Sequence, residues 1–313
     1  MTGPLVVAVV GPTATGKSDL GLDLAEALGG EVVNADASQL YRGMDIGTAK
    51  LAPVKRRGIP HHQLDVLEVT DEASVAAYQS ASRADLHAIQ GRGLHPVVVG
   101  GSGLYVRAAL DVLDIPPTDP QLRARLEAEA EELGAAAMAE RLRALDPVAM
   151  ERMQPNNVRR IVRALEVVEL TGRPFSASMP TREFVQPTVV LGLRVARAEL
   201  DERIVERVDR MWEQGLLDEV RTLDGLGLRR GRTASRALGY AQALAELDGR
   251  LDGRQAREET VALTRRFARR QESWFGPDHR IHWLDAGAEH RGDLTARALA
   301  TVRAAIRDND DHG

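Results

Sequence analysis

Eight residues near the start of the sequence have the types and spacing of a phosphate-binding loop. The segment Gly11-Pro12-Thr13-Ala14-Thr15-Gly16-Lys17-Ser18 fits the pattern G-x-x-x-x-G-K-[ST]. Its glycines let backbone N–H groups turn toward a polyphosphate, and the helix that follows adds positive potential at its N-terminus. Lys17 is expected to bridge phosphate oxygens, and Ser18 is the expected Mg²⁺ ligand. The sequence thus predicts a polyphosphate site formed by Gly11, Thr13, Ala14, Thr15, Gly16, Lys17 and Ser18.

The acidic partner of this loop is not where a kinase would have it. A kinase or NTPase usually has a second strand that ends in an aspartate for magnesium. The most apolar candidate, 96–99, runs instead into Gly100 and Gly101, whereas the strand pattern at 31–34 is followed by Asp36. At the carboxyl edge of a parallel sheet, Asp36 would face the phosphate loop. Three roles are open for it: a magnesium ligand, a general base, or the N-cap of the next turn.

The elements that position these residues alternate between strand and helix patterns. Short runs typical of buried parallel strands occur at 5–10, 31–34, about 63–67, 96–99, 189–195 and 281–284. Helical stretches separate most of them, which predicts an open parallel sheet with helices on both faces. The predicted fold class is therefore α/β, with a P-loop NTPase-like parallel sheet core.

A helical insertion is predicted where the strand signal disappears. Asp119 is a helix cap before Pro120, and 121–133 is rich in Ala, Glu, Arg and Leu. A second helix pattern, 158–170, ends at Gly172. We expect residues 1–115 to form the first part of the core, 116–187 an all-helical insertion, and 188–313 the rest of the core with C-terminal helices.

The amino-acid composition excludes several classes of protein. The 313 residues are 43% hydrophobic and 28% charged, as in an ordinary globular protein. No apolar run reaches the roughly 18 to 20 residues of a membrane span, and the first ten residues have no basic region of a signal peptide. Cysteine is absent, which excludes disulfides and thiol chemistry. We expect a cytoplasmic protein that is not bound to membranes.

Charge is unevenly distributed along the chain. The net charge of −5 argues against a uniformly basic nucleic-acid binder. Yet 152–173 and 257–275 carry local excesses of three and two positive charges, and all of their positive residues are arginines. In the second run the arginine pairs 265/269 and 266/270 are four residues apart and would form adjacent rows on a helix. From the residues alone, RNA contact and a solvated helix face are equally open.

Several further blocks resemble one family, the tRNA dimethylallyltransferases, also called tRNA isopentenyltransferases. The resemblance spans about residues 5–285 and is far more specific than the phosphate loop alone. Ala37 and Asn157 depart from the residues common in that family. The matching blocks are Asp36 to Lys50, Pro60-His61-His62, Gly100 to Tyr105, Asp119-Pro120, Arg160 to Glu166, Thr171-Gly172, Gly239-Tyr240 and Thr264 to Trp274.

The resemblance implies an enzyme that transfers a dimethylallyl group from dimethylallyl diphosphate to N6 of the adenine 3′ of the tRNA anticodon, releasing diphosphate. It implies catalytic roles for Asp36, Ser102, Arg236 and Lys17, with Mg²⁺ as cofactor. The anticodon stem-loop would contact Asp36, Ala37, Ser38, Gln39, Ser102, Arg123, Arg159, Arg160, Ile161, Val162 and Arg163. We expect a monomer, because one tRNA per chain requires no second subunit.

Two other functions remain as alternatives. A P-loop small-molecule kinase would use the same loop for ATP, but it gives no reason for the arginine-rich helices. A non-catalytic RNA-binding protein would use the loop only as a phosphate anchor. Turnover with release of pyrophosphate separates the enzyme from the binding protein.

Overall fold

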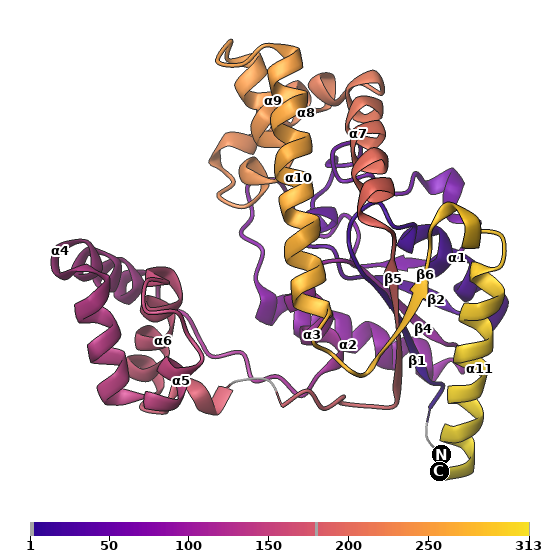
Figure 1. Cartoon of the computed structure of the whole chain (residues 1–313), viewed down its shortest axis with the longest axis horizontal. Helices are drawn as coiled ribbons and strands as arrows, with labels where there is room; N and C mark the ends of the chain where they lie inside the picture. The colour runs from indigo at the N-terminus through magenta and orange to yellow at the C-terminus, as the bar shows by residue number, and fades with distance from the viewer. Residues whose placement is uncertain (1–2, 179–180, 313) are drawn as a thin grey trace. The chain divides into compact units, whose positions relative to one another are not determined.

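The computed structural model describes residues 3–178 and 181–312, which divide into two compact units. The first unit contains the residues up to Leu110 together with those from Phe184 onward, and the second is Asp111–Glu183. Figure 1 shows the first unit as a sheet with helices on both faces, and the second as helices only. Among the described residues, no helix is both long and apolar enough to span a bilayer.

The sheet of the first unit has six parallel strands in the order β3-β2-β4-β1-β5-β6. This confirms the predicted parallel α/β core. The strands are β1 (Val6–Val10), β2 (Glu31–Asn34), β3 (His61–His62), β4 (Pro96–Val99), β5 (Thr188–Arg194) and β6 (Ile281–Asp285).

One strand differs from its prediction. The edge strand β3 is His61–His62, not 63–67, and it pairs with Val32 and Val33 of β2. Gln63 and Asp65 have positive φ angles of 58° and 56°, which take the chain out of extended geometry directly after His62. Leu67 forms only an isolated bridge with Tyr41. The apolar pattern at 63–67 therefore reflects packing of a loop.

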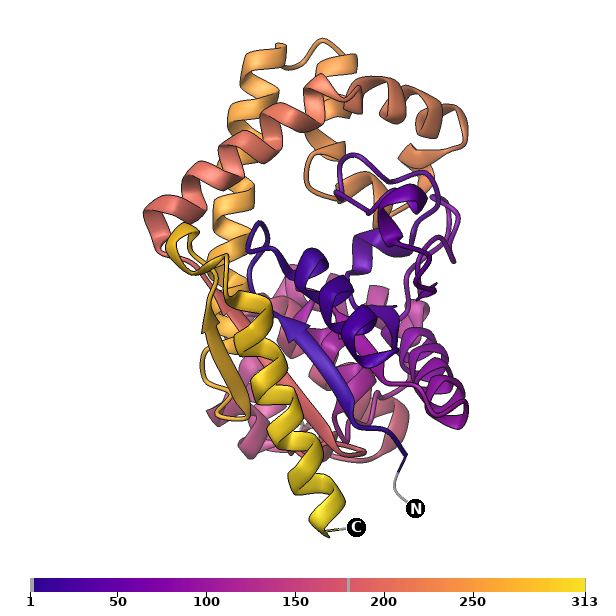
Figure 2. The same cartoon turned by 90° about the vertical axis from the view of Figure 1, so that its right-hand side faces the viewer.

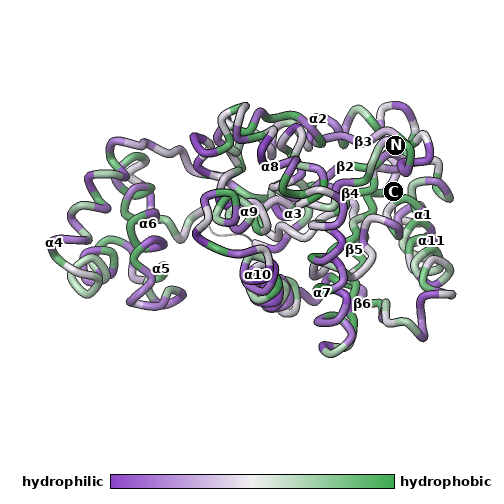
Figure 3. The backbone as a smooth tube through the Cα atoms, turned by 90° about the horizontal axis from the view of Figure 1, so that it is seen from above, coloured by the Kyte–Doolittle hydropathy of each residue, from purple (hydrophilic) through white to green (hydrophobic). Residues whose placement is uncertain are grey.

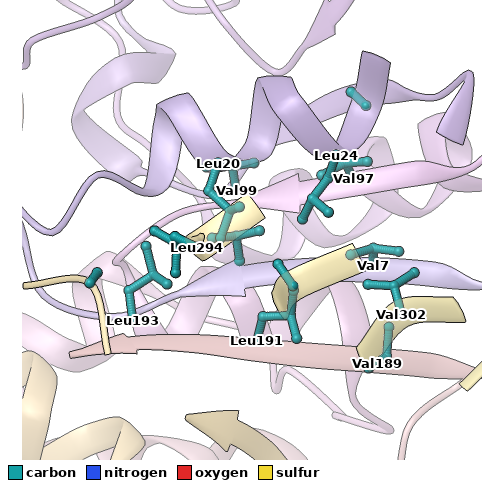
Figure 4. Close-up of a cluster of buried hydrophobic side chains, with 14 of the residues drawn as sticks. Val7, Leu20, Leu24, Val97, Val99, Val189, Leu191, Leu193, Leu294 and Val302 are labelled. Atoms are coloured by element: carbon teal, nitrogen blue, oxygen red, sulfur yellow. The ribbon is translucent and has the colours of Figure 1, made fainter. Parts of the chain in front are cut away.

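Helices cover both faces of the sheet. Leu20 and Leu24 of α1 and Leu294 and Val302 of α11 pack against the strands on one face (Figure 4). Figure 2 shows α11 running alongside this face, and Figure 3 shows β5 as mainly hydrophobic and α7 as largely hydrophilic. The helices of this unit are α1 (Lys17–Leu28), α2 (Val75–Gly91), α3 (Gly103–Leu110), α7 (Arg197–Glu213), α8 (Leu216–Gly225), α9 (Tyr240–Leu247), α10 (Gly253–Phe275) and α11 (Leu294–His312).

A second hydrophobic cluster joins α7, α8 and α9 to the chain that follows β2. Tyr41 and Met44 are buried in it together with Leu216, Val220 and Tyr240. This packing fixes the segment 41–50 against helices that come some 170 residues later in the chain. Short 3₁₀ turns connect the elements of this unit: η1 (Ala37–Leu40), η2 (Pro53–Arg56), η4 (Leu228–Arg230), η5 (Ala234–Arg236) and η6 (Ala288–His290).

The second unit is a small helical bundle. It consists of α4 (Pro120–Leu145), α5 (Pro147–Glu151), α6 (Val158–Thr171) and the turn η3 (Phe175–Ser178). As the sequence predicts, Asp119 caps α4 by accepting hydrogen bonds from the amides of Gln121 and Leu122, and Gly172 ends α6 with a φ of 66°. Helix α4 extends twelve residues beyond the predicted end, with a break at Gly134. The bundle has its own hydrophobic core.

Candidate active site

The phosphate loop lies between β1 and α1, as the sequence predicts. Gly11 has a φ of 132°, and a Cβ there would lie 2.5 Å from the carbonyl oxygen of Leu193 in the neighbouring strand, so only glycine fits. Ala14 and Gly16 also have positive φ angles, and Thr15 Oγ1 donates to the carbonyl of Pro12 at 2.8 Å. These turns bring the loop back to the N-terminus of α1, where the first amides have no partners within the helix.

The loop opens onto a cavity of about 890 Å³ at the carboxyl edge of the sheet. Residues 13–20 form one side of it, and the ends of β2 and β4 form its floor. The segment 45–56 and one face of α7 complete the walls. Its charged and polar lining residues include Lys17, Ser18, Asp36, Gln39, Thr48, Arg207 and Gln271.

Among the cations that line this cavity, Lys17 and Arg207 lie close enough for the charge of one to act on the other. Lys17 Nζ donates to the carbonyl of Pro12 at 2.5 Å, and Arg207 reaches in from α7. Burial, and then the positive charge of Arg207, lower the pKa of Lys17 to about 7, although the negative charge of Asp36 opposes them. Arg207 was not predicted from the sequence. Its helix is rich in arginine, and nothing in the local pattern separates it from its neighbours.

Asp36 lies at the end of β2 and lines the cavity, where its charge acts on both Lys17 and Arg207. One carboxylate oxygen, Oδ1, accepts a hydrogen bond from Ser38 N at 3.0 Å and so caps η1. The cap interpretation is therefore confirmed. It does not exclude a chemical role, because the carboxylate has a second oxygen and several further lone pairs.

Ser102 and Gln39 support the loop around Asp36. Ser102 Oγ accepts from the amide of Ala37 at 3.1 Å, and Gln39 Nε2 donates to the carbonyl of Thr48 at 3.2 Å. Gln39 lines the cavity, whereas Ala37 and Ser38 are half-buried in η1. No acid stands at the end of β4, where a Cβ on Gly100 would lie 2.2 Å from the carbonyl oxygen of Ala35. That position cannot carry the aspartate of a kinase.

Arg236 is not brought to the cavity. It is an exposed residue at the end of η5, and it is not among the described residues that line the cavity. The arginine that lies close to Lys17 of the phosphate loop in this cavity is Arg207. A sequence motif identifies Arg236 from the residues next to it in the chain, but it does not show what lies near it in the fold. The position of Arg207 depends on how α7 packs over the sheet.

A second residue that the sequence left without a role is Gln271 of α10. Its side chain is buried, accepts a hydrogen bond from Thr13 N at 2.9 Å and donates one to the carbonyl of Gly101 at 2.9 Å. It thus joins the phosphate loop to the turn after β4. Since the Thr13 amide is bonded to Gln271, any contact of Thr13 with a phosphate would come from its hydroxyl.

The residues present fit a magnesium ion only in part. Ser18 lines the cavity in the first turn of α1, next to the exposed carboxylate of Asp19. Across 3–178 and 181–312, no group of three or more His, Asp or Glu side chains is arranged to hold a metal, and this covers His61 and His62. Mg²⁺ commonly takes one or two protein oxygens and completes its shell with phosphate oxygens and water. Ser18 suits that kind of site.

Two arginines of the second unit, Arg123 and Arg163, form ion pairs with the same buried carboxylate. Glu166 is fully buried and accepts from Arg123 and Arg163, and Arg163 also donates to the carbonyls of Pro116 and Pro117. Burial disfavours the charge on Glu166, but these hydrogen bonds and the one from the Asp119 amide hold its pKa below its usual value. Arg123 and Arg163 therefore hold the bundle together.

The remaining predicted tRNA contacts of this unit lie at the start of α6. Ile161 and Val162 are buried in the core of the bundle, so their side chains do not reach its surface. Arg159 and Arg160 are exposed beside them. Asn157, the departure from the family pattern, caps α6 by accepting from Arg160 N at 3.3 Å, so it acts within its own helix. Of the arginines predicted to contact tRNA, Arg159 and Arg160 are exposed, whereas Arg123 and Arg163 pair with Glu166.

The amino-acid sequence is similar to one family of known proteins. Residues 39–278 match the sequence profile of the family described as IPP transferase. A tRNA dimethylallyltransferase from Streptomyces coelicolor is 59% identical over 303 residues, which cover 97% of each chain. One from Kineococcus radiotolerans is 60% identical over 308 residues, 96% of this chain and 97% of that one.

Solved structures agree with the sequence comparison. The full-length tRNA isopentenylpyrophosphate transferase of Bacillus halodurans has a TM-score of 0.73 and 35% identity, covering 98% of both chains. A eukaryotic dimethylallyltransferase described as acting on tRNA has a TM-score of 0.81 and 27% identity, covering 95% of this chain and 77% of its own. With this extent of sequence and structural agreement, the chain belongs to the IPP transferase family.

Proposed function

We propose that this protein is a tRNA dimethylallyltransferase, which moves the dimethylallyl group of dimethylallyl diphosphate to N6 of the adenine 3′ of the anticodon. One observation carries this proposal: two cations at a phosphate loop share a cavity with Asp36, while the kinase position after β4 is closed to any side chain. A diphosphate donor and a nucleophile that must lose a proton need this combination. The family to which the chain belongs supports the same activity.

The donor diphosphate binds at the phosphate loop and is stabilised as it leaves. The bond between C1 of the dimethylallyl group and the bridging oxygen breaks, and both electrons go to the diphosphate. Lys17, Arg207 and the loop amides lie where the added negative charge develops. Ser18 would hold Mg²⁺, which would supply further charge neutralisation at the diphosphate. The carbon is allylic, so positive charge spreads over the dimethylallyl group during cleavage.

The acceptor adenine enters at Asp36. Its N6 forms the new bond to C1, and the Asp36 carboxylate accepts the proton that N6 loses. Ser38 N and Ser102 Oγ hold the loop that carries this carboxylate. The adenine has to leave the anticodon stack to reach the cavity, as in other enzymes that modify bases. Ser102 and Gln39 act mainly by positioning the loop.

The tRNA backbone is bound by exposed arginines. Arg159 and Arg160 in the second unit, and Arg266, Arg269 and Arg270 on α10, are exposed and can carry their positive charge to phosphates. Arg123 and Arg163 hold Glu166 and support the helix from which Arg159 and Arg160 project. The enzyme works as a monomer in the cytoplasm, where its tRNA substrates are.

The test is incubation of the purified chain with magnesium, unmodified tRNA and labelled dimethylallyl diphosphate, followed by nucleoside digestion and mass analysis. We expect an adenosine heavier by one dimethylallyl group, with one pyrophosphate released per transfer. A parallel sample with ATP in place of the donor is the control. ATP consumption without modified adenosine would refute the proposal and favour the kinase alternative.

A further inference from the structure

The segment 41–50, whose later residues from Asp45 line the cavity, is held on one side by a buried lysine. Lys50 Nζ donates to the carbonyl of Tyr41 at 2.8 Å, to Asp45 Oδ1 at 2.8 Å and to Asp65 Oδ1 at 2.6 Å. An ammonium group has three donors, and all three are in use. This explains why one of the three lysines of an arginine-rich chain is found here. Lys50 thus ties the two ends of the segment to each other and to Asp65.

On its other side the segment is held by Glu219 of α8. The carboxylate accepts hydrogen bonds from three successive backbone amides, those of Asp45 at 3.2 Å, Ile46 at 2.8 Å and Gly47 at 3.4 Å. It also accepts one from the hydroxyl of Tyr240 at 2.6 Å. Consecutive amides of this kind form an anion-binding nest. Here the anion that fills the nest is a side chain of the protein itself.

Tyr240 fits this arrangement closely. Its ring is fully buried, and a Cβ on Gly47 would lie 2.4 Å from the ring atom Cε2, so the segment must carry glycine there. Burial, and then the nearby negative charge of Glu219, raise the pKa of Tyr240. The hydroxyl therefore stays protonated and donates to the carboxylate at all physiological pH values.

The residue after the nest links Glu219 to the cavity. The carbonyl of Thr48 accepts hydrogen bonds from Arg207 Nη2 at 3.2 Å and from Gln39 Nε2 at 3.2 Å. Arg207 and Gln39 line the cavity, whereas Glu219 and Tyr240 are not among the described residues that do. A continuous path therefore runs from Glu219 through the amides of 45–47 to the Thr48 carbonyl and the Arg207 guanidinium.

We propose that Glu219 is a positioning residue for the donor diphosphate, which acts through the Thr48 carbonyl to hold Arg207 at the phosphate loop. This inference rests on the proposed function only in naming the donor; the path itself consists of contacts within the first unit. Without the carboxylate, three amides lose their acceptor and the segment shifts. Arg207 then loses the acceptor that directs it into the cavity, and affinity for the diphosphate falls.

The test is a double-mutant cycle between Glu219 and Arg207, read by calorimetric binding of dimethylallyl diphosphate and, separately, of inorganic pyrophosphate. We expect Glu219→Ala to weaken binding about tenfold in the wild-type background and less than twofold in Arg207→Ala, because residues in one hydrogen-bonded network couple strongly. Steady-state kinetics should show the donor KM rising by a similar factor. An equal loss in both backgrounds would overturn the proposal.

Matched variants separate positioning from a loss of folding. Asp218→Ala, the preceding residue of α8 whose side chain is exposed and pairs with Arg221, should leave donor binding unchanged. Glu219→Gln keeps an acceptor for two amides and should restore most of the affinity, and Tyr240→Phe should give a smaller coupled loss. A lower melting temperature in Glu219→Ala with unchanged affinity would also overturn the proposal. If wild-type protein transfers no prenyl group, the proposed function fails, while the pyrophosphate cycle still decides the role of Glu219.

Discussion

The side-chain carbonyl of Gln271 accepts a hydrogen bond from the backbone amide of Thr13 at 2.9 Å across 258 positions of sequence. The same side chain donates to Gly101, so one buried amide group joins the phosphate loop, the turn after β4 and helix α10. No room remains for rearrangement there, since a Cβ on Gly101 would lie 2.3 Å from Gln271 Nε2. The shape of the phosphate loop thus depends on a helix near the end of the chain.

Replacing Gln271 should change both stability and donor use. Gln271→Ala leaves the partly buried amide of Thr13 and the buried carbonyl of Gly101 without this partner, so we expect the unfolding free energy to fall by about 2 kcal/mol. Gln271→Glu keeps the acceptor for Thr13 but places a carboxylate against the Gly101 carbonyl and near the donor site, so the donor KM should rise further. Thermal melts and steady-state kinetics measure the two effects. Ser273→Ala, an exposed position of the same helix, is the control; a Gln271→Glu enzyme with a normal donor KM would contradict this role.

Asp36→Asn tests the proton acceptor without removing the cap. The amide oxygen of asparagine can still accept the hydrogen bond from Ser38, whereas Asp36→Ala would remove the chemistry and the cap together. We expect kcat to fall by about a thousandfold, with the dissociation constant of the donor changed little. Single-turnover transfer and calorimetric donor binding measure these quantities. Turnover within a few-fold of wild type would remove Asp36 from the mechanism.

Donor binding should take up a proton at Lys17. Its pKa is about 7 in the free protein, so at pH 8 most of the lysine is neutral, and the negative diphosphate raises the pKa again. Affinity is therefore greatest below pH 7 and falls by up to about tenfold per pH unit above it. Calorimetry in buffers of different ionisation enthalpy measures the number of protons that the protein takes up when the donor binds. Lys17→Arg, whose charge does not titrate, should abolish the slope, and an equal slope in that variant would assign the proton to another group.

The two exposed arginines at the start of α6 should behave differently from the ion-paired Arg163. Arg159→Ala and Arg160→Ala remove exposed charges, so each should weaken tRNA binding and reduce the salt dependence of log Kd by about one. Arg163→Ala removes a partner of the buried Glu166, so it should lower the unfolding free energy by about 2 kcal/mol. Filter binding at several salt concentrations and thermal melts distinguish the two kinds of arginine. Loss of stability without loss of tRNA affinity in Arg160→Ala would reverse the assignment.

The local features of this protein could be predicted from its sequence. The phosphate loop, five of the six strands and the helix that begins at Val158 all follow from short patterns of glycine, β-branched and periodic apolar residues. The position of Asp36 follows as well, because a residue just after a parallel strand lies at the carboxyl edge of the sheet. The edge strand β3 was misplaced, because two residues of pairing leave almost no pattern to detect.

Only the tertiary structure decides which distant side chains meet at the cavity. Arg207 reaches the cavity while Arg236 does not, and Gln271 and Glu219 bind backbone groups from which 170 or more positions separate them. The sequence determines that this chain is an α/β protein with a phosphate loop and the motifs of its family. Contacts between residues far apart leave no trace in local periodicity, because they depend on the packing of whole helices against the sheet.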